Sequence, residues 1–507
     1  MKNGLRFWLV AAATACLVTI FLAPLQMMPF GRDQAGFAVG AHLQEKQGFS
    51  LDHFWNVRPP GMVFWMLAAR ELIGPLEENA RRLEWIWMIL TCMIAAIVAY
   101  EWTERSRLAA VLAALLLASR YLAGGFTQTM QPAGLALLPL LLSLLCWGPG
   151  GKPRSRRRLL AGGFLLSLAT LFAAKAVWTA PALIGFEWFY RRRESPADNR
   201  IGDLSFFIAG LVGLPILLLF WWLGGIDWSS IWQIFQGRLN EYATTPNFFP
   251  LDVLTVLALG FLFIRAAPPR PACGQLAVLL LVLGAATALS SAGTDRLLAF
   301  GPLAVGAAVT VAEGAALINR RWPTRILPWL VGALLSLIFL FGGPWLNASR
   351  QWHYFLRYLG GDSVFYLADF FNDPETSFSY AVTREAAGEI SRLTRPDWRL
   401  FVWGSEPGLY HYSGLTPAGN CLALAPVLDG GTARRRTLEL FQDHPPEVVA
   451  VRENDPLTPH LHGFRNSRDT LVSFPAIHRA LIEQYRIAGR VFDFTLYLRR
   501  DLEPPAR

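Results

Sequence analysis

The sequence predicts a polytopic α-helical membrane protein that carries an α/β domain at its C-terminal end. Hydrophobic residues make up 53% of the 507 residues and charged residues only 16%, whereas a soluble chain carries roughly a quarter charged residues. Long apolar runs recur along the first two thirds of the chain, and polar residues return after residue 342. This composition excludes a disordered protein, a secreted disulfide scaffold and an ordinary soluble enzyme.

A helix needs about 20 mostly apolar residues to cross a bilayer, so we expect about eleven transmembrane helices within residues 1–342, the first predicted domain. The apolar runs are Leu5–Met28, Leu83–Trp102, Leu108–Ala123, Pro132–Trp147, Leu159–Ala174, Val177–Tyr190, Leu204–Leu223, Val253–Ile264, Leu276–Ser290, Leu297–Ile318 and Ile326–Phe341. The first run follows a basic start, as in a signal peptide. Because no small-residue cleavage site follows it, we expect a retained anchor.

Basic residues determine the predicted orientation of these spans. Clusters of Lys and Arg occupy every second connection, beginning with Lys2 and Arg6 before the first span and including Arg156–Arg158 after the fourth. The positive-inside rule assigns such connections to the cytoplasm, and it requires residues 159–190 to cross twice, turning near Lys175. We therefore predict a bacterial inner-membrane protein with a cytoplasmic N-terminus. The net charge of +9 then reflects topology and predicts no nucleic-acid partner.

The second predicted domain, residues 343–507, lies outside the cytoplasm in this topology and reads as a small α/β domain. Strands alternate with helices there, which favours a largely parallel sheet. The predicted strands are Arg399–Trp403, Val448–Val451 and Phe492–Leu498, and the predicted helices are Val382–Leu393, Thr432–Phe441 and Ala476–Tyr485. Glu406 lies at the end of a strand, where α/β domains bind ligands, although Ser405–Gly408 is more simply a turn.

The segment between the first two spans, Gln26–Arg82, carries the main candidate residue. Asp33 follows the first span by a few residues. Gln34–Gln47 and Met62–Ile73 are predicted to be amphipathic helices that are too short to span, so we expect them along the membrane surface. Asp33 fits two roles, the N-cap of the helix that starts at Gln34 or a functional carboxylate.

Three basic residues fall on predicted outer segments, where the positive-inside rule makes them unusual. They are Arg58, Lys175 and Arg296. Pro59–Pro60, directly after Arg58, would begin the second surface helix, because proline suits the first turn of a helix. Each basic residue fits either a phosphate contact or a snorkelling side chain, and Arg296 also fits an ion pair with Asp295.

The pattern around these residues resembles the glycosyltransferase C superfamily, in particular the branch of protein O-mannosyltransferases and the lipid A aminoarabinose transferase (glycosyltransferase family 39-like). The resemblance spans almost the whole chain through topology, but rests on few specific residues. These are Arg32-Asp33-Gln34, Asp52-His53-Phe54-Trp55, Arg58-Pro59-Pro60-Gly61 and, in the tail, the stretch from Phe401 to Tyr410 followed by Tyr412-Ser413-Gly414.

The resemblance implies an inverting hexosyl or pentosyl transferase. It would move a sugar from a polyprenyl phosphate, such as undecaprenyl phosphate, to an extracytoplasmic acceptor: lipid A, another lipid or glycan, or a protein. Asp33 would activate or orient the acceptor hydroxyl. Arg58, Lys175 and Arg296 would hold the donor phosphate, and the donor's lipid tail would lie between spans, among membrane lipid. A carboxylate and neutralising cations are what this chemistry requires.

Departures from the family pattern bear on the mechanism. Gln34 stands where many members carry Glu, and Val57 where some carry a metal-binding Glu. A divalent metal is therefore only weakly supported, and we predict no metal site and no other cofactor. Arg58 replaces a common Lys and would bind phosphate with a planar fork. Asp52 and His53 would support the site as an acid–base pair or order the loop around them.

Two other functions stay open at this stage. About eleven spans also suit a transporter or flippase for a lipid-linked or anionic solute, although such proteins usually show internal repeats or charges at mid-membrane. The Gln34 departure keeps open an inactive relative that acts as a scaffold. A transferase requires Asp33, Arg58 and Lys175 to converge on one outward cavity, which the alternatives do not.

Overall fold

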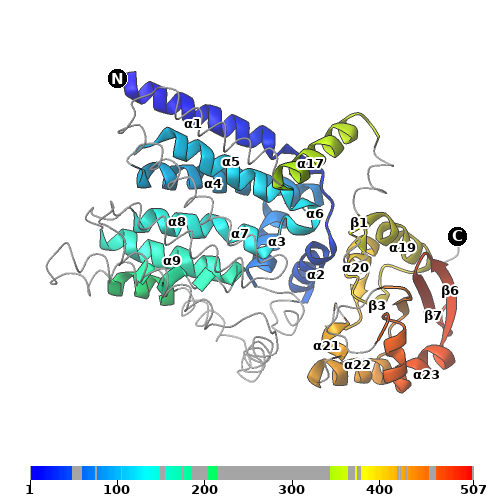
Figure 1. Cartoon of the computed structure of the whole chain (residues 1–507). Helices are drawn as coiled ribbons and strands as arrows, with labels where there is room; N and C mark the ends of the chain where they lie inside the picture. The colour runs from blue at the N-terminus through cyan, green and yellow to red at the C-terminus, as the bar shows by residue number, and fades with distance from the viewer. Residues whose placement is uncertain are drawn as a thin grey trace. The chain divides into compact units, whose positions relative to one another are not determined.

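The computed structural model describes a large part of the chain (Figure 1). It describes residues 2–47, 60–74, 77–103, 105–148, 155–173, 176–177, 179–181, 183–184, 204–213, 343–362, 372–373, 378–419, 422, 424–428, 431–455 and 464–504. The chain divides into two compact units, Met1–Met28 with Glu78–His353, and Pro29–Glu77 with Tyr354–Arg507. The predicted boundary at residue 342, between a transmembrane domain and an extracytoplasmic domain, stays a prediction.

The first unit is helical throughout its described residues, with α4 and α17 extending slightly past its limits. Its elements are α1 (Lys2–Phe21), η1 (Ala23–Met27), α4 (Glu77–Trp102), α5 (Arg107–Ala123), α6 (Gly125–Gln128), α7 (Pro132–Leu135), α8 (Leu137–Trp147), α9 (Arg156–Phe172) and α17 (Gly343–Leu359). Helix α1 packs on α5, and α8 packs on α9 (Figure 1).

Helices occupy the first five predicted spans. Two helical stretches of the described residues, Trp8–Met27 and Glu77–Trp102, are long and apolar enough to cross a membrane, and Pro132–Trp147 and Leu204–Gly213 are apolar but shorter. The spans predicted at residues 253–341 lie outside the described residues, so the count of about eleven stays a prediction.

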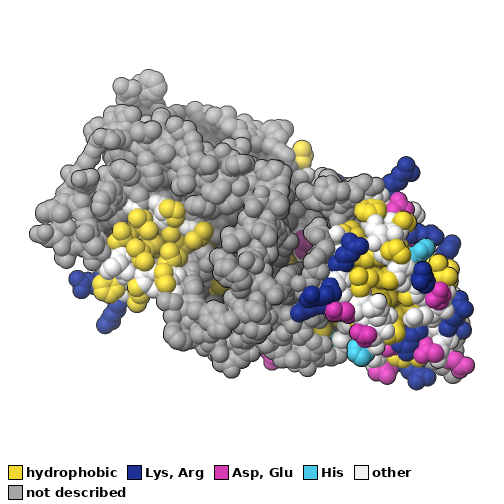
Figure 2. All heavy atoms as spheres, turned by 90° about the horizontal axis from the view of Figure 1, so that it is seen from below, with side chains coloured by type: hydrophobic (Ala, Val, Ile, Leu, Met, Phe, Trp, Pro, Cys, Tyr) yellow, Lys and Arg dark blue, Asp and Glu magenta, His cyan; other side chains and the backbone are white. Residues whose placement is uncertain are grey.

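Figure 2 shows exposed hydrophobic side chains gathered in one area of the first unit. The exposed residues of α9 and of the helix Leu204–Gly213 include Leu160, Phe164 and Ile208. A Cβ atom at Gly163 of α9 would collide with the backbone of Phe207, so glycine is required for these two helices to approach so closely. Small residues at helix contacts and apolar residues facing outward are typical of membrane helices.

A fully buried ion pair lies near the start of α4. Arg81 Nη1 is 2.7 Å from Glu84 Oε2, and both side chains are 0% exposed. Arg81 Nε donates to the Met28 carbonyl at 2.9 Å, and the Tyr121 hydroxyl donates to Glu84 at 2.5 Å. That hydroxyl accepts from the backbone N–H of Met130 at 2.8 Å. Charges buried this deeply persist only when they are paired and hydrogen-bonded, so this network ties α4 to α5 and η1.

Replacing Arg81 by Met should destabilise the first unit by about 3–5 kcal/mol, because Glu84 would stay buried without its cation. Thermal unfolding of the full-length protein in detergent, followed by tryptophan fluorescence, measures this loss. The matched control is Arg82→Met. The Arg82 side chain is 55% exposed and 3.6 Å from Glu78, so its loss should cost under about 1 kcal/mol. Equal unfolding midpoints for the two variants would contradict this role of Arg81.

The second unit combines two helices of the first predicted outer segment with a five-stranded sheet. Its main elements are α2 (Arg32–Gln47), α3 (Pro60–Ile73), β1 (Asn372–Asp373), β2 (Phe378–Ser379), α19 (Tyr380–Leu393), β3 (Arg399–Trp403), α20 (Gly408–Ser413), β4 (Thr416–Pro417), α21 (Ala425–Leu428), α22 (Gly431–Asp443), β5 (Val448–Arg452), η6 (Asp469–Ser473), α23 (Pro475–Gln484), β6 (Tyr485–Val491) and β7 (Phe494–Arg499). Helix α2 packs against both α3 and α20.

The two helices predicted after the first span are confirmed, and α3 begins at Pro60 as predicted. The expectation that α2 is amphipathic is wrong. Its buried side chains include Phe37, Val39 and Leu43, which at 100° per residue point in different directions around the helix axis. Helix α2 is therefore enclosed on several sides. Its placement relative to a membrane surface stays a prediction.

The sheet has the strand order β4-β3-β5-β7-β6. The strands and helices predicted for the tail are confirmed to within a few residues. The expectation of a largely parallel sheet is only half right, since β3 pairs in parallel with β4 and β5, whereas β7 pairs antiparallel with β5 and β6. The cause is the short connection at Phe492 and Asp493, because a two-residue turn can join only antiparallel strands.

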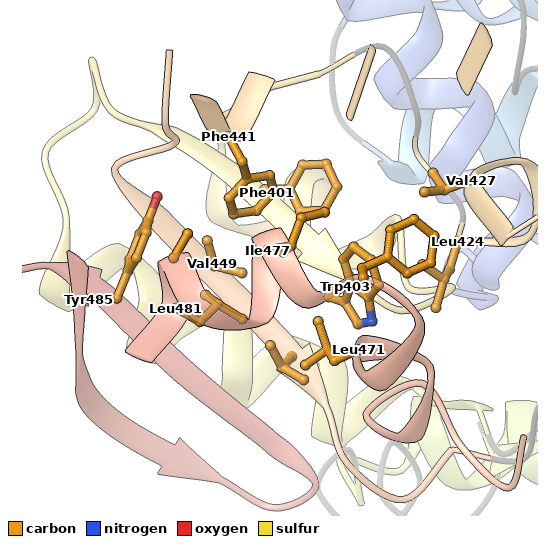
Figure 3. Packing of buried hydrophobic residues seen from close by; sticks show 13 residues of the cluster. Phe401, Trp403, Leu424, Val427, Phe441, Val449, Leu471, Ile477, Leu481 and Tyr485 are labelled. Atoms are coloured by element: carbon orange, nitrogen blue, oxygen red, sulfur yellow. The ribbon is translucent and has the colours of Figure 1, made fainter. Parts of the chain in front are cut away.

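The hydrophobic core of the second unit packs against β3 and β5, two of the three inner strands of the sheet. Figure 3 shows Phe401 and Trp403 of β3 and Val449 of β5 packed with Ile477 and Leu481 of α23. Every residue of β5 is buried, as expected for a strand covered on both faces. The residues that follow the carboxyl ends of β3 and β5 are therefore held on a rigid base.

Candidate functional site

Asp33 lies in the first turn of α2. The helix begins at Arg32, one residue earlier, and the backbone N–H of Ala35 donates to the Gly31 carbonyl at 3.0 Å. The alternative role of Asp33 as the N-cap is therefore wrong, because the residue is already inside the helix. A carboxylate in the first turn is favoured by the partial positive charge of the helix N-terminus.

Asp33 and its neighbour Gln34 have opposite environments. The Asp33 side chain is exposed, whereas Gln34 is 0% exposed. Successive helical residues point about 100° apart, so the two side chains do not form a paired site. A neutral amide also suits a buried position better than a carboxylate does. Of these two residues, Asp33 is the one that a substrate in solution can reach.

The residue before Asp33 is anchored to the C-terminal sheet. Arg32 Nη2 lies 3.2 Å from Glu406 Oε2, with the two side chains 22% and 1% exposed. Glu406 Oε2 is also 3.0 Å from Arg452 Nη1, and Arg452 Nε is 2.8 Å from Asp493 Oδ2. Burial raises the pKa of the Glu406 carboxyl, and the charges of Arg32 and Arg452 oppose that rise. The four groups form one alternating ion chain with no net charge.

A second contact holds the chain three residues before Asp33. The Tyr412 hydroxyl lies 3.3 Å from the Phe30 carbonyl oxygen and 3.2 Å from Glu77 Oε1. The same Glu77 carboxylate accepts the backbone N–H of Phe30. The Phe30 ring packs on His411, with centroids 5.3 Å apart, and Tyr412 meets Tyr380 edge to face at 5.6 Å. Helix α20 therefore fixes the backbone that leads into α2.

His411 and Tyr412 of α20 both favour their neutral forms around physiological pH. Burial raises the pKa of the Tyr412 hydroxyl well above its ordinary value, and the charge of Glu77 adds to this rise. Burial lowers the pKa of His411 to about 4, and electrostatic interactions with Arg384 and His42 lower it further. Neither group carries a charge that would disturb the contacts of Phe30.

The Asp33 carboxylate is the one predicted site residue within the described part of the chain. Arg58, Lys175 and Arg296, predicted to hold phosphate, lie outside it, as do the supporting residues Asp52 and His53. Their roles and their convergence with Asp33 stay predictions. Among the described residues, no three His, Cys, Asp or Glu side chains are grouped to hold a metal ion.

Sequence patterns did not indicate the residues that hold this segment, which are Arg32, Arg452, Glu77 and Tyr412. Arg32 and Tyr412 do fall within the stretches that carry the family resemblance, and Glu406 was assigned to a turn. That turn exists, because the Leu409 N–H donates to the Glu406 carbonyl at 3.2 Å. The Glu406 side chain pairs with Arg32 and Arg452, which are 374 and 46 positions away in the sequence. Local sequence patterns carry no signal of such distant pairs.

Comparisons with known proteins identify the fold. No family model matches the sequence, and no curated protein matches it significantly. The crystal structure of ArnT from Cupriavidus metallidurans bound to undecaprenyl phosphate matches with a TM-score of 0.52 and 13% identity, covering 97% of this chain and 98% of that chain. Its apo structure gives the same score and identity, covering 98% of each chain. The Archaeoglobus fulgidus oligosaccharyltransferase in the apo form reaches 0.49 at 11% identity, covering 87% of this chain and 69% of that chain.

The chain therefore shares the fold of ArnT, and the resemblance to the glycosyltransferase C superfamily is confirmed at the level of the fold. The TM-score of 0.52 over nearly the full length of both chains establishes the fold, and at 13% identity the activity must be inferred from the site.

The low pKa of His411 predicts an acid sensitivity of the second unit. Between pH 6.5 and about 4, the unfolded chain takes up a proton at His411 that the folded chain does not, so stability should fall as the pH falls through this range. The His411→Gln variant lacks this proton uptake. Its apparent melting temperature should therefore decline less than that of the wild type over the same range, measured on the full-length protein in detergent. Parallel declines would contradict the burial of a neutral His411.

Proposed function

We propose that the protein is an inverting glycosyltransferase that moves a sugar from a polyprenyl phosphate to an acceptor outside the cytoplasm. The observation that carries this proposal is an exposed carboxylate, Asp33, in the first turn of a helix whose start is held by partly buried contacts at Phe30 and Arg32. The fold supports it, because ArnT shares that fold and has been crystallised with undecaprenyl phosphate.

The proposed reaction is a displacement at the anomeric carbon of the donor sugar. The acceptor hydroxyl attacks this carbon from the face opposite the phosphate, so the new glycosidic bond forms with inversion. The bond from the sugar to the phosphate oxygen breaks, and polyprenyl phosphate leaves with both bonding electrons. Asp33 accepts the proton of the acceptor hydroxyl as general base. Arg58, Lys175 and Arg296 neutralise the charge that develops on the leaving phosphate.

The proposed location is the bacterial inner membrane, with the N-terminus in the cytoplasm and the α/β domain in the periplasm. In this topology, Asp33 and the C-terminal sheet are on the same side of the membrane, as their membership of one compact unit requires. The acceptor is then a lipid such as lipid A, a glycan or a protein that is exposed in the periplasm. The donor carries a hexose or a pentose.

The direct test uses the purified full-length protein in nanodiscs with radiolabelled undecaprenyl-phosphate-linked mannose, glucose and 4-amino-4-deoxyarabinose. Envelope lipids and glycans from cells that lack the gene serve as acceptors. The wild type should transfer one of these sugars and release undecaprenyl phosphate. Asp33→Asn should reduce that rate by at least about 100-fold, as loss of a general base does.

The control variant is Glu71→Gln, which removes an exposed carboxylate of α3 and should leave the rate unchanged. A wild-type rate for Asp33→Asn would contradict the catalytic role. Failure of the wild type to consume any of the donors would contradict the transferase function. Movement of an intact donor across the bilayer would instead support a flippase.

The proposed phosphate contacts predict a separate binding defect. Arg58→Gln should weaken the binding of undecaprenyl phosphate by about tenfold or more, because one charge-assisted contact to phosphate contributes about 1.5–3 kcal/mol. Native mass spectrometry of the full-length protein with undecaprenyl phosphate measures this change, with Glu71→Gln again as the control. Unchanged binding would remove Arg58 from the donor site.

A further inference from the structure

The C-terminal sheet carries a structural device that acts on Asp33. We propose that Glu406 and Arg452 are positioning residues, which hold the Asp33 carboxylate in its working orientation through Arg32. This inference rests on the proposed function, in which Asp33 acts on the acceptor hydroxyl. It makes the C-terminal domain a part of the catalytic site.

Arg32 lies at the start of α2. It is the first residue of α2 and directly precedes Asp33, so a fixed Arg32 side chain restricts how the first turn can rotate or fray. Its guanidinium is 3.2 Å from Glu406 and lies over the Phe378 ring at 5.9 Å. Both partners belong to the C-terminal part of the chain: Phe378 precedes α19, and Glu406 follows β3. Helix ends fray unless they are held in this way.

The loop after β3 holds the segment around Asp33 at several points. A Cβ atom at Gly36 would be 3.5 Å from Pro407, so α2 lies directly against the residue that follows Glu406. Tyr412, at the other end of this short stretch, reaches the Phe30 carbonyl at 3.3 Å. The stretch from Glu406 to Tyr412 therefore contacts the chain both before Asp33, at Phe30, and after it, at Gly36.

The base behind Glu406 is the carboxyl end of the buried strand β5. Arg452 is the last residue of β5 and is 5% exposed, and it joins Glu406 to Asp493 in the turn between β6 and β7. Strands β3 and β5 pair in parallel through Trp403 and Val451, so Glu406 and Arg452 both follow or end strands at the same edge of the sheet. This carboxyl edge is where α/β sheets build their sites.

The buried ions contribute a defined geometry more than they contribute stability. Glu406 is 1% exposed between two arginines, and removing two opposite charges from water costs about as much as their attraction returns. Apolar residues would stabilise the sheet equally well, so stability alone does not account for the chain of ions. What an ion chain adds over an apolar contact is a defined geometry for the groups at its ends, and one of those ends is Arg32.

The opposite edge of the same two strands supplies a matched control. Arg399, the first residue of β3, donates from its backbone N–H to Glu447 at 2.9 Å and from Nη2 at 3.0 Å. Burial alone would raise the pKa of the Glu447 carboxyl, but the hydrogen bonds from Arg399 lower it below its ordinary value. This pair ties β3 to β5 as the Glu406 pair does, but within the described part of the chain its hydrogen bonds and ion pairs involve no residue of α2.

The experiment compares Glu406→Gln with Glu447→Gln in the full-length protein, using the undecaprenyl-phosphate-linked sugar that the wild type transfers. Glu406→Gln should lower kcat by about 10- to 100-fold, the loss expected when a catalytic group is displaced by about 1 Å. Because the donor phosphate is proposed to contact Arg58, Lys175 and Arg296 instead of Glu406, KM for the donor should change little. Glu447→Gln should leave kcat unchanged, even where it lowers the melting temperature as much.

A second measurement does not depend on catalysis. Hydrogen exchange of the backbone from Phe30 to Gly36 should speed up in Glu406→Gln and stay at the wild-type rate in Glu447→Gln. Glu406→Asp keeps the charge and should restore part of both the protection and kcat. The double variant Arg32→Gln/Glu406→Gln should lose no more kcat than the worse single variant, because the two residues act as a unit.

The positioning role is overturned if Glu406→Gln retains the wild-type kcat, or if Glu406→Gln and Glu447→Gln lose kcat in step with their melting temperatures. It is also overturned if the two losses in the double variant simply add. These results differ from failure of the proposed function itself. If Asp33→Asn is fully active, the transferase role of Asp33 fails, while faster exchange from Phe30 to Gly36 in Glu406→Gln would still establish that Glu406 orders this segment.

Discussion

The second unit depends on one buried carboxylate, that of Glu406, which lies within 3.2 Å of Arg32 and 3.0 Å of Arg452. These contacts join a helix of the first predicted outer segment to a sheet built more than 350 residues later in the chain. Without a cation on each side, a carboxylate that is 1% exposed would be neutralised or would disrupt its surroundings. The pairing therefore dictates that α2 and the carboxyl edge of the sheet fold as one unit.

The sheet holds the Glu406 pairing in place, and helix α2 links this pairing to the Asp33 carboxylate. Strands β3 and β5 are covered on both faces, with Trp403 and Val449 in the core. Helix α2 is enclosed around Phe37 and Leu43, yet presents Asp33 at an exposed position of its first turn. A rigid, largely buried helix with one accessible carboxylate is the arrangement expected of a group that must meet a substrate at a fixed distance. The first unit has a buried ion pair of its own, between Arg81 and Glu84.

The parts of the fold that could be predicted from the sequence are those set by local chemistry. Pro60 begins α3 as expected, and strand β3 has the predicted bounds because Arg399–Trp403 is a short apolar run of strand length. Strand β6 was missed, since several of its residues face solvent and show no apolar alternation. The Arg32 to Glu406 pair was also beyond prediction, because charges far apart in sequence show neither their burial nor their partner. Asp33 could be found from the family pattern, but its place inside the helix could not.

The account requires Asp33 and the predicted phosphate ligands Arg58 and Lys175 to meet around one donor. A cryo-electron microscopy structure of the full-length protein in nanodiscs with undecaprenyl phosphate tests this most directly. The account predicts that the bound phosphate contacts Arg58 and Lys175 and lies on the same side of the membrane as Asp33, with room for a sugar between phosphate and carboxylate. A phosphate bound at the opposite membrane face, or one that contacts neither basic residue, would contradict it.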